Sequence, residues 1–360
     1  MKKTYSVIIG TGSYIPERVV VNADFMDHHF YDKEGTKFET GTDTIIQKFT
    51  EITEIEERRH VEEDKNTSDL AFHAAERCIE NAGIDKETLD YIIVAHNFGD
   101  IMKGSLQTDI LPSLASRVKE KLGIINHKTV AYDTVFGCPG WVQGLIQANY
   151  YIRSGDAKRV MVIGADVLSR ISDPHDRDSM IYADGAGAAI LEARESDTPV
   201  GILAHNTRTD ANGMTYSLYL GKSFNVQHPE QNMYIKMNGH KIYEYALKNV
   251  PGVVKEGLEK AEVDIKQVSK VLIHQANAKM DDAILKRLMR LYNIKEVPEN
   301  IMPMTIAKLG NSSVATVPTL LDLILRGNMP GHKLSAGDIA VFTSVGAGMN
   351  INCIVYKFPE

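Results

Sequence analysis

Cys138 is the first residue in the sequence that is placed for nucleophilic chemistry. It follows a predicted strand over residues 129–132 and precedes a segment of helical periodicity, in which Pro139 suits the first helical position and Gly155 suits the end. A thiol at the start of a helix faces unpaired backbone N–H groups and the positive end of the helix dipole, which favour the reactive thiolate. A free cysteine is nevertheless more often a small buried hydrophobic residue, so position alone leaves both roles open.

His274 and Asn311 stand in similar settings in the second half of the chain. His274 closes a predicted strand over residues 271–273, and the residues up to Asn277 read as the start of the next helix. Sites in α/β sheets are built at this end of a strand. Asn311 lies in a Gly-rich entry to a helical pattern, where asparagine is commonly only an N-cap. Each residue alone is ambiguous, but two halves related by a pseudo-dyad would bring such junctions together.

The elements that must position these residues alternate between short β-branched runs and longer segments with three- and four-residue apolar spacing. The predicted strands of the first half are residues 6–9, 91–95, 129–132 and 159–164. Continuous apolar strands separated by amphipathic helices are typical of sheets that are covered on both faces. The pattern therefore predicts a layered α/β fold.

Two stretches of the chain repeat a helix, a turn and a strand in the same register. Residues 78–94 read like residues 257–273, and the Gly-rich segment 185–190 reads like 346–351. These internal repeats predict two homologous α/β halves. The expected halves are residues 1–195, with the cysteine, and residues 196–360, with the histidine and the asparagine, joined at a polar segment that ends in Pro199.

Composition narrows the classes of protein that fit. The 360 residues are 43% hydrophobic and 24% charged, and the net charge of −7 gives no global positive field to hold nucleic acid or an anionic membrane. Three cysteines form no disulfide framework, and Cys78 and Cys353 are expected to be structural. No apolar run approaches the ~20 residues of a membrane span, and no His/Cys spacing indicates a metal site. We expect a cytoplasmic protein without a metal.

Taken in chain order, the motifs resemble those of β-ketoacyl-acyl carrier protein synthase III, a family of the thiolase superfamily. The resemblance runs nearly from end to end. The motifs that carry it are residues 9–17, Cys138 with its glycines, residues 173–177, residues 184–189, His274 to Asn277, Gly310 to Ser313 and residues 346–348. The resemblance implies a thiolase-like fold, in which two duplicated α/β halves form a five-layer αβαβα arrangement.

The resemblance also implies a mechanism. Cys138 would attack an acyl thioester, typically an acyl-CoA, and hold the acyl group. Malonyl-acyl carrier protein would then lose carbon dioxide, and its carbanion would attack the acyl-cysteine to give a 3-oxoacyl-acyl carrier protein, which initiates fatty-acid synthesis. His274 and Asn311 would donate hydrogen bonds to the malonyl thioester carbonyl, and the backbone N–H groups of Cys138 and Ala347 would form an oxyanion hole. Such a reaction needs no metal or redox cofactor.

An acidic carrier protein needs a basic face on this net-acidic chain. The predicted helix after His274 provides one, with Lys279, Lys286 and Arg290 on a common stripe and Arg287 beside it. An ordinary solvated helix face is the alternative, but the position beside the histidine favours carrier docking. The resemblance further implies a homodimer.

Two segments depart from the family pattern. Residues 32–56 form a longer stretch than usual that lacks the tryptophan expected to stack on the adenine of CoA, and a basic residue expected near Ile52 is absent. Arg177 is what remains of the usual adenine clamp. A second insertion, residues 98–111, ends at Leu111, where a bulkier aromatic residue commonly caps the acyl pocket of the partner subunit. These changes raise two alternatives, a donor carried by acyl carrier protein and a longer or branched acyl primer.

Two other functions stay open at this point. One is a pathway-specific synthase that joins longer acyl thioesters, as for dialkylresorcinol-type lipids, which the insertions and the missing tryptophan would suit. The other is a non-condensing acyltransferase or scaffold protein with the same fold. Proteins of that kind commonly lose the histidine or the asparagine, and this chain retains both His274 and Asn311.

Overall fold

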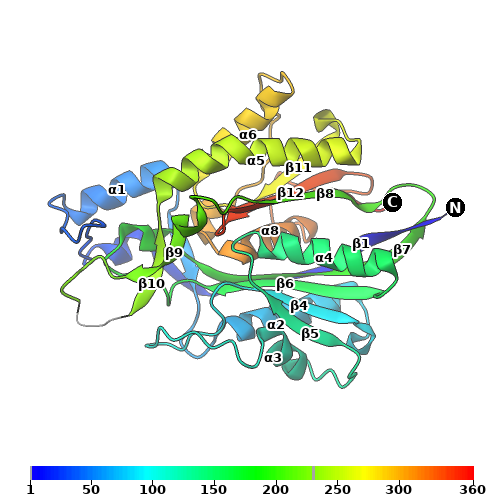
Figure 1. The fold of residues 1–360 in the computed structure, drawn as a ribbon, viewed down its shortest axis with the longest axis horizontal. Helices are drawn as coiled ribbons and strands as arrows, with labels where there is room; N and C mark the ends of the chain where they lie inside the picture. Colours follow the sequence, from blue (N-terminus) through cyan, green and yellow to red (C-terminus); the bar gives the residue numbers. More distant parts are fainter. Residues whose placement is uncertain (1, 229–231) are drawn as a thin grey trace.

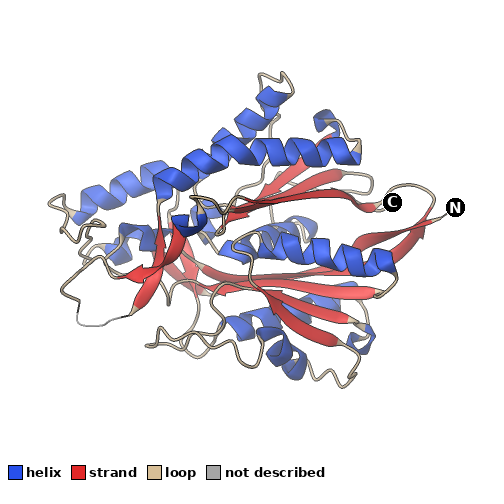
Figure 2. Cartoon of the chain, viewed as in Figure 1, coloured by secondary structure: helices blue, strands red, loops and turns tan. Residues whose placement is uncertain are grey.

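Two main sheets, stacked between three layers of helices, form the body of the molecule (Figure 1; Figure 2). The computed structural model describes residues 2–228 and 232–360. The first sheet has the strand order β1-β7-β6-β4-β5, and the second has the order β11-β12-β13-β8. The strands of the first are β1 (Lys3–Tyr14), β4 (Tyr91–Ala95), β5 (Val130–Thr134), β6 (Arg159–Val167) and β7 (Asp184–Ser196), and those of the second are β8 (Gly201–Thr209), β11 (Val268–Ile273), β12 (Ile339–Gly346) and β13 (Asn350–Lys357).

Each helix layer is a pair of helices that covers a sheet face. The outer face of the first sheet packs against α2 (Thr67–Ala82) and α3 (Leu114–Lys121), and the outer face of the second is covered by α5 (Gly239–Ala261) with α6 (Ala278–Leu291) beside it. The middle pair, α4 (Gly140–Ser154) and α8 (Thr316–Leu325), lies between the sheets and contacts both. The predicted five-layer αβαβα arrangement is confirmed. The smaller elements include β2 (Arg18–Val21), α1 (Thr42–Thr53), β3 (Glu57–His60), β9 (Leu218–Lys222), β10 (Met233–Met237) and α7 (Ile306–Leu309).

The glycines of β1 allow a close contact between sheet and helix. The sequence predicts this strand only over residues 6–9, but it pairs antiparallel with β7 along most of its length, so it continues to Tyr14. A Cβ atom at Gly12 would lie 2.4 Å from the carbonyl oxygen of Ala74 in α2. The absence of side chains here lets α2 settle on the sheet, so this Gly-rich segment is a packing surface.

The two sheets draw on separate parts of the chain. The first uses strands within residues 3–196 and the second uses strands within residues 201–357. We propose the boundary between the halves at residues 195 and 196, at the end of β7. Among the described residues, no helix combines the length and the apolar character that crossing a membrane requires.

Asp281 is a carboxylic acid on the buried face of α6. It has 0% exposure, and neither carboxyl oxygen has a hydrogen-bond partner among the described residues. Burial raises the pKa of Asp281 well above its ordinary value because the charged form is deprived of water. The folded protein therefore favours the protonated acid at a pH where the unfolded chain releases the proton.

Replacing Asp281 by asparagine is expected to stabilise the protein near neutral pH. The raised folded-state pKa means that the wild type loses stability as the pH rises above the unfolded value of about 3.9, and the amide has no proton to lose. The gain should be at least about 1.4 kcal/mol at pH 7, the linkage cost of each unit by which burial raises the folded-state pKa, and should vanish below about pH 4. Urea unfolding of both proteins at several pH values measures it. A difference in stability that does not change with pH would contradict the assignment.

Candidate active site

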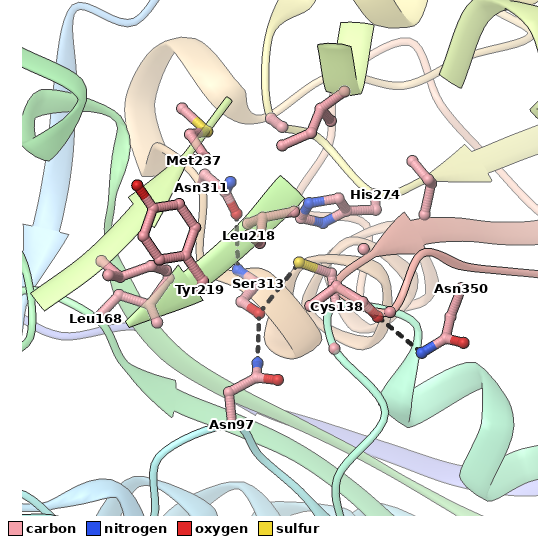
Figure 3. A pocket seen from close by; sticks show the side chains of 18 of the residues that line it. Asn97, Cys138, Leu168, Leu218, Tyr219, Met237, His274, Asn311, Ser313 and Asn350 are labelled. Atoms are coloured by element: carbon pink, nitrogen blue, oxygen red, sulfur yellow. Dashed lines mark hydrogen bonds between the residues drawn. The ribbon is translucent and has the colours of Figure 1, made fainter. Parts of the chain in front are cut away.

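Cys138, His274 and Asn311 line the same cavity, although they come from distant segments of the chain (Figure 3). The cavity has a volume of about 760 Å³ and a mostly apolar lining. Cys138 precedes α4, His274 follows β11, and Asn311 lies between α7 and α8. All three are at the ends or starts of elements, as the sequence predicts. The structure thus brings the two halves together at one point.

The helix start holds Cys138 but does not set its pKa by itself. Pro139 is the N-cap of α4 and Gly155 is its C-cap with a positive φ of 85°, so the predicted helix is present and begins one residue later. Burial raises the pKa of the Cys138 thiol to about 11, and a hydrogen bond from Ser313 opposes this increase. The backbone at the helix start lowers the thiol pKa, as expected, but desolvation of the charged form outweighs this contribution.

His274 is a buried, neutral imidazole. Burial lowers its pKa to about 4, since the charged imidazolium is poorly solvated in the site. Its backbone N–H donates to the carbonyl of Thr343, and its Nδ1 atom has no hydrogen-bond partner among the residues described. The next residue, Gln275, anchors the start of α7 by accepting hydrogen bonds from the backbone N–H groups of Thr305 and Ile306. A neutral imidazole can donate one hydrogen bond without changing its charge.

The side-chain amide of Asn311 is oriented by its own loop. Its Oδ1 atom accepts a hydrogen bond from the backbone N–H of Ser313 at 2.8 Å, so its Nδ2 group is the end that can donate to a substrate. Gly310, which precedes it, has a φ of 64°, and a Cβ there would lie 2.8 Å from the Cβ of Arg58. The backbone geometry therefore requires the glycine at position 310.

Two loops that carry the proposed oxyanion hole are in direct contact. A Cβ at Gly346 would lie 2.6 Å from the backbone nitrogen of Cys138, and one at Gly137 would lie 2.7 Å from the backbone nitrogen of Ala347. The side-chain amide of Asn350 donates to the carbonyl of Ala347 at 2.7 Å and ties this loop down. The close approach supports, as a proposal, the paired N–H donors of Cys138 and Ala347.

The β9–β10 hairpin forms a wall of the cavity that sequence reasoning missed. Leu218, Tyr219 and Ile235 of the hairpin line the cavity. The hairpin is anchored by Lys236, which is 1% exposed and whose Nζ atom lies 2.5 Å from Asp173. The anchor joins residues that are 63 positions apart, and a lysine in a strand pattern gives no signal of burial.

A second cavity of about 600 Å³ lies beside the first and shares Met237, Ile242, Ala276 and Met280 with it. Arg177 lines this second cavity, and its guanidinium carbon lies 5.3 Å from the ring centroid of Phe38. The inserted segment thus supplies an aromatic ring opposite the arginine even though it lacks a tryptophan. Lys48 of α1 also lines this cavity, one helical turn before Ile52. Sequence reasoning missed both Phe38 and Lys48.

The remaining predicted residues lie on the surface of the chain. Lys279, Lys286, Arg287 and Arg290 are exposed on α6, with Lys286 paired to Asp282 and Arg287 donating to the carbonyl of Leu247. Leu111 is 86% exposed and is not part of the cavity lining in the single chain. Carrier docking on α6 and a role for Leu111 across a dimer interface stay predictions.

Comparison with known proteins adds independent information about this arrangement. The family model of 3-oxoacyl-[acyl-carrier-protein (ACP)] synthase III matches residues 132–211, and the model of its C-terminal part matches residues 258–358. β-Ketoacyl-[acyl-carrier-protein] synthase III 1 of Vibrio parahaemolyticus is 32% identical over 359 residues, which cover 98% of this chain and 100% of that protein. The chain belongs to the β-ketoacyl-acyl carrier protein synthase III family.

Solved structures agree with membership of the synthase III family. The crystal structure of 3-oxoacyl-[acyl-carrier-protein] synthase III from Aquifex aeolicus matches with a TM-score of 0.78 at 29% identity, covering 98% of this chain and 100% of that one. The priming β-ketosynthase of the R1128 polyketide biosynthetic pathway matches with a TM-score of 0.80 at 25% identity, covering 100% and 97%. The predicted family and fold are confirmed, and this member of the synthase III family is a condensing acyltransferase.

Proposed function

We propose that the chain condenses an acyl-CoA primer with malonyl-acyl carrier protein to give 3-oxoacyl-acyl carrier protein and carbon dioxide, and so initiates fatty-acid synthesis. The observation that carries the proposal is the meeting of Cys138, His274 and Asn311 in one apolar cavity, in a chain of the synthase III family. The reaction has two halves, and each uses different members of the site.

In the first half, the Cys138 thiolate attacks the carbonyl carbon of the primer thioester. The new carbon–sulfur bond forms to Cys138, and the bond to CoA breaks, so that CoA leaves as its thiol with the proton that Cys138 gave up. Backbone N–H groups of Cys138 and Ala347 would hold the oxyanion of the tetrahedral intermediate. The acyl chain would lie along the apolar wall that includes Leu218 and Ile235.

In the second half, the bond between the malonyl α-carbon and its carboxylate breaks, and carbon dioxide leaves. The electron pair stays as an enolate, whose oxygen would accept hydrogen bonds from His274 and from Nδ2 of Asn311. These donors are neutral and lie in a site of low polarity, where they stabilise a developing negative charge strongly. The enolate carbon then attacks the acyl-cysteine, and the bond to the Cys138 sulfur breaks to regenerate the thiolate.

The second cavity suits the CoA part of the acyl donor. It adjoins the cysteine cavity at the shared residues Met237 and Ala276. An adenine base could stack on the outer face of the Arg177–Phe38 pair, and Lys48 adds a positive charge for phosphate. This arrangement favours CoA as the primer donor. Acyl carrier protein would approach over the exposed lysines and arginines of α6 in the second half.

A longer acyl primer for a specialised lipid is the second candidate. The size of the apolar cavity favours it. It shares both half-reactions with the first candidate, and the two differ only in the primer that is accepted.

The test incubates the wild-type protein with acetyl-, isobutyryl-, hexanoyl-, octanoyl- and decanoyl-CoA, and separately with the same acyl groups on acyl carrier protein. Intact-protein mass reports acylation of Cys138, and addition of malonyl-acyl carrier protein reports condensation. Labelling by short acyl-CoA, followed by formation of 3-oxoacyl-acyl carrier protein, is the expected result. Labelling restricted to long chains would select the second candidate, and labelling without condensation would contradict both.

Arg177→Ala provides the matched comparison for the donor. Because Arg177 lies in the second cavity and not in the lining of the first, its loss should slow labelling from acyl-CoA about tenfold, the value of a modest charged contact of about 1.4 kcal/mol. Labelling from acyl-carrier protein, which has no adenine, should change little. Equal losses with both donors would argue against an adenine site on the Arg177–Phe38 pair.

A further inference from the structure

A row of hydrogen bonds joins Asn97 to Ser313 and Ser313 to the sulfur of Cys138 (Figure 3), and the buried carboxyl of Asp166 holds Asn97 at the far end. The hydroxyl of Ser313 lies 3.4 Å from the Cys138 Sγ atom. Nδ2 of Asn97 lies 3.0 Å from the Ser313 Oγ atom and 2.6 Å from Oδ2 of Asp166, and the backbone N–H of Asn97 donates to Oδ1 of Asp166 at 2.9 Å. These four residues come from four separate segments of the chain. The arrangement is not needed by either half-reaction as described above.

The donors and acceptors in this row fix the direction of the Ser313 hydroxyl. Asp166 accepts from both N–H groups of Asn97, which sets the orientation of the side-chain amide. The Nδ2 group then donates to the Ser313 oxygen, because an amide nitrogen has no acceptor capacity. The Ser313 oxygen therefore accepts from Asn97 and donates its own proton to the sulfur. Asp166 also interacts with the Ser313 hydroxyl and is the competing acceptor, but burial raises the pKa of this carboxyl and so favours its neutral, weaker-accepting form. Ser313 also has a φ of 53°, and its backbone N–H is held by Asn311, so the loop that presents the hydroxyl is firmly placed.

We propose that Ser313 is a positioning residue that stabilises the Cys138 thiolate by donating a hydrogen bond to its sulfur, and that Asn97, held by Asp166, orients Ser313 for this purpose. The proposal rests on the proposed role of Cys138 as the nucleophile. It explains how a thiol in an apolar, buried site reaches its reactive form, since a hydrogen bond to a charged acceptor is worth more than one to a neutral acceptor.

The other charged or titratable groups that face the sulfur do not favour the thiolate. Asp166 lies close enough to raise the pKa of Cys138, His274 is neutral because burial lowers its pKa, and the buried Tyr182 phenol has a raised pKa and carries no charge. Of the side chains named for this site, the Ser313 hydroxyl is the one that lowers the pKa of the thiol. Loss of that hydroxyl should therefore reduce the thiolate population directly.

The test measures alkylation of the full-length protein by iodoacetamide across a range of pH, with intact-protein mass as the readout and Cys138→Ala as the blank for the two buried cysteines. Ser313→Ala and Ser313→Gly should both alkylate about tenfold more slowly than the wild type between about pH 7 and 9, which corresponds to a rise of about one unit in the thiol pKa. The difference should narrow at higher pH as the thiol ionises in every protein. A purely steric change would keep the ratio of the variant and wild-type alkylation rates the same at every pH.

Two further variants separate this role from general disturbance of the loop. Ser312→Ala removes the neighbouring hydroxyl, which contacts Thr316 instead, and should react like the wild type. Asn97→Ala should slow alkylation about threefold, and combining it with Ser313→Ala should add nothing, because Asn97 acts through Ser313. Folded Ser313 variants with the wild-type alkylation profile would overturn the proposal, and multiplying effects in the double variant would overturn the part assigned to Asn97. Alkylation requires no acyl substrate, so a failure of the proposed function would be seen separately in the labelling test.

Discussion

His274→Ala and Asn311→Ala are each expected to lower the rate of decarboxylative condensation by about 10²–10³-fold while leaving acylation of Cys138 close to the wild-type rate. The magnitude is that of losing one preorganised donor to an oxyanion, about 2.7–4 kcal/mol of barrier. Condensation is affected and acylation is not because His274 and Asn311 would donate hydrogen bonds to the enolate, whereas the backbone N–H groups would stabilise the acyl-transfer intermediate. A single-turnover assay with pre-acylated enzyme and malonyl-acyl carrier protein measures the second half alone.

The pH dependence of the His274 contribution provides a further check on this prediction. Because burial lowers the pKa of His274 to about 4, the imidazole stays neutral throughout the physiological range, and condensation should not show a histidine titration between about pH 6 and 8. Asn311→Asp, which puts an acceptor-only group in place of a donor, should be at least as damaging as Asn311→Ala. Equal losses of acylation and condensation in these variants would mean that the pair does not serve the enolate specifically.

Local patterns in the sequence predict most of the fold because each depends on neighbouring residues. Apolar periodicity predicts the strand at residues 91–95 with the observed bounds, and it predicts the junctions that place Cys138 and His274. The internal repeat anticipates the stacking of two α/β sheets. The triad itself depends on the resemblance, since the local setting of each residue fits an ordinary structural role equally well.

The parts that sequence reasoning missed are polar contacts between distant segments. Asn97 and Ser313 are 216 positions apart and Lys236 and Asp173 are 63 apart, so no periodicity connects them. The desolvation that raises the pKa of the Cys138 thiol was missed for the same reason. The helix start is visible in the sequence, whereas desolvation by the surrounding halves is a property of the assembled cavity. Phe38 was missed because it lies in an insertion, outside the family pattern.

Cys138→Ala should abolish the covalent acyl-enzyme and lower condensation on the order of 10⁴-fold or more, since no other described side chain in the cavity offers a thiol. The variant keeps His274 and Asn311, so it should still release carbon dioxide from malonyl-acyl carrier protein at a measurable rate. This is the reverse of the result expected for the His274 and Asn311 variants, which retain acylation and lose decarboxylation.

Together, the two sets of variants show which residues serve acylation and which serve decarboxylation. Intact-protein mass gives the acyl-enzyme, and release of labelled carbon dioxide gives decarboxylation independently of condensation. Melting temperatures of the variants serve as the control for folding, because Cys138 is only partly exposed and its truncation leaves a small void. Acylation that persists at wild-type stoichiometry in Cys138→Ala would place the acyl group on another residue, and the two-step scheme would then have to be abandoned at its first step.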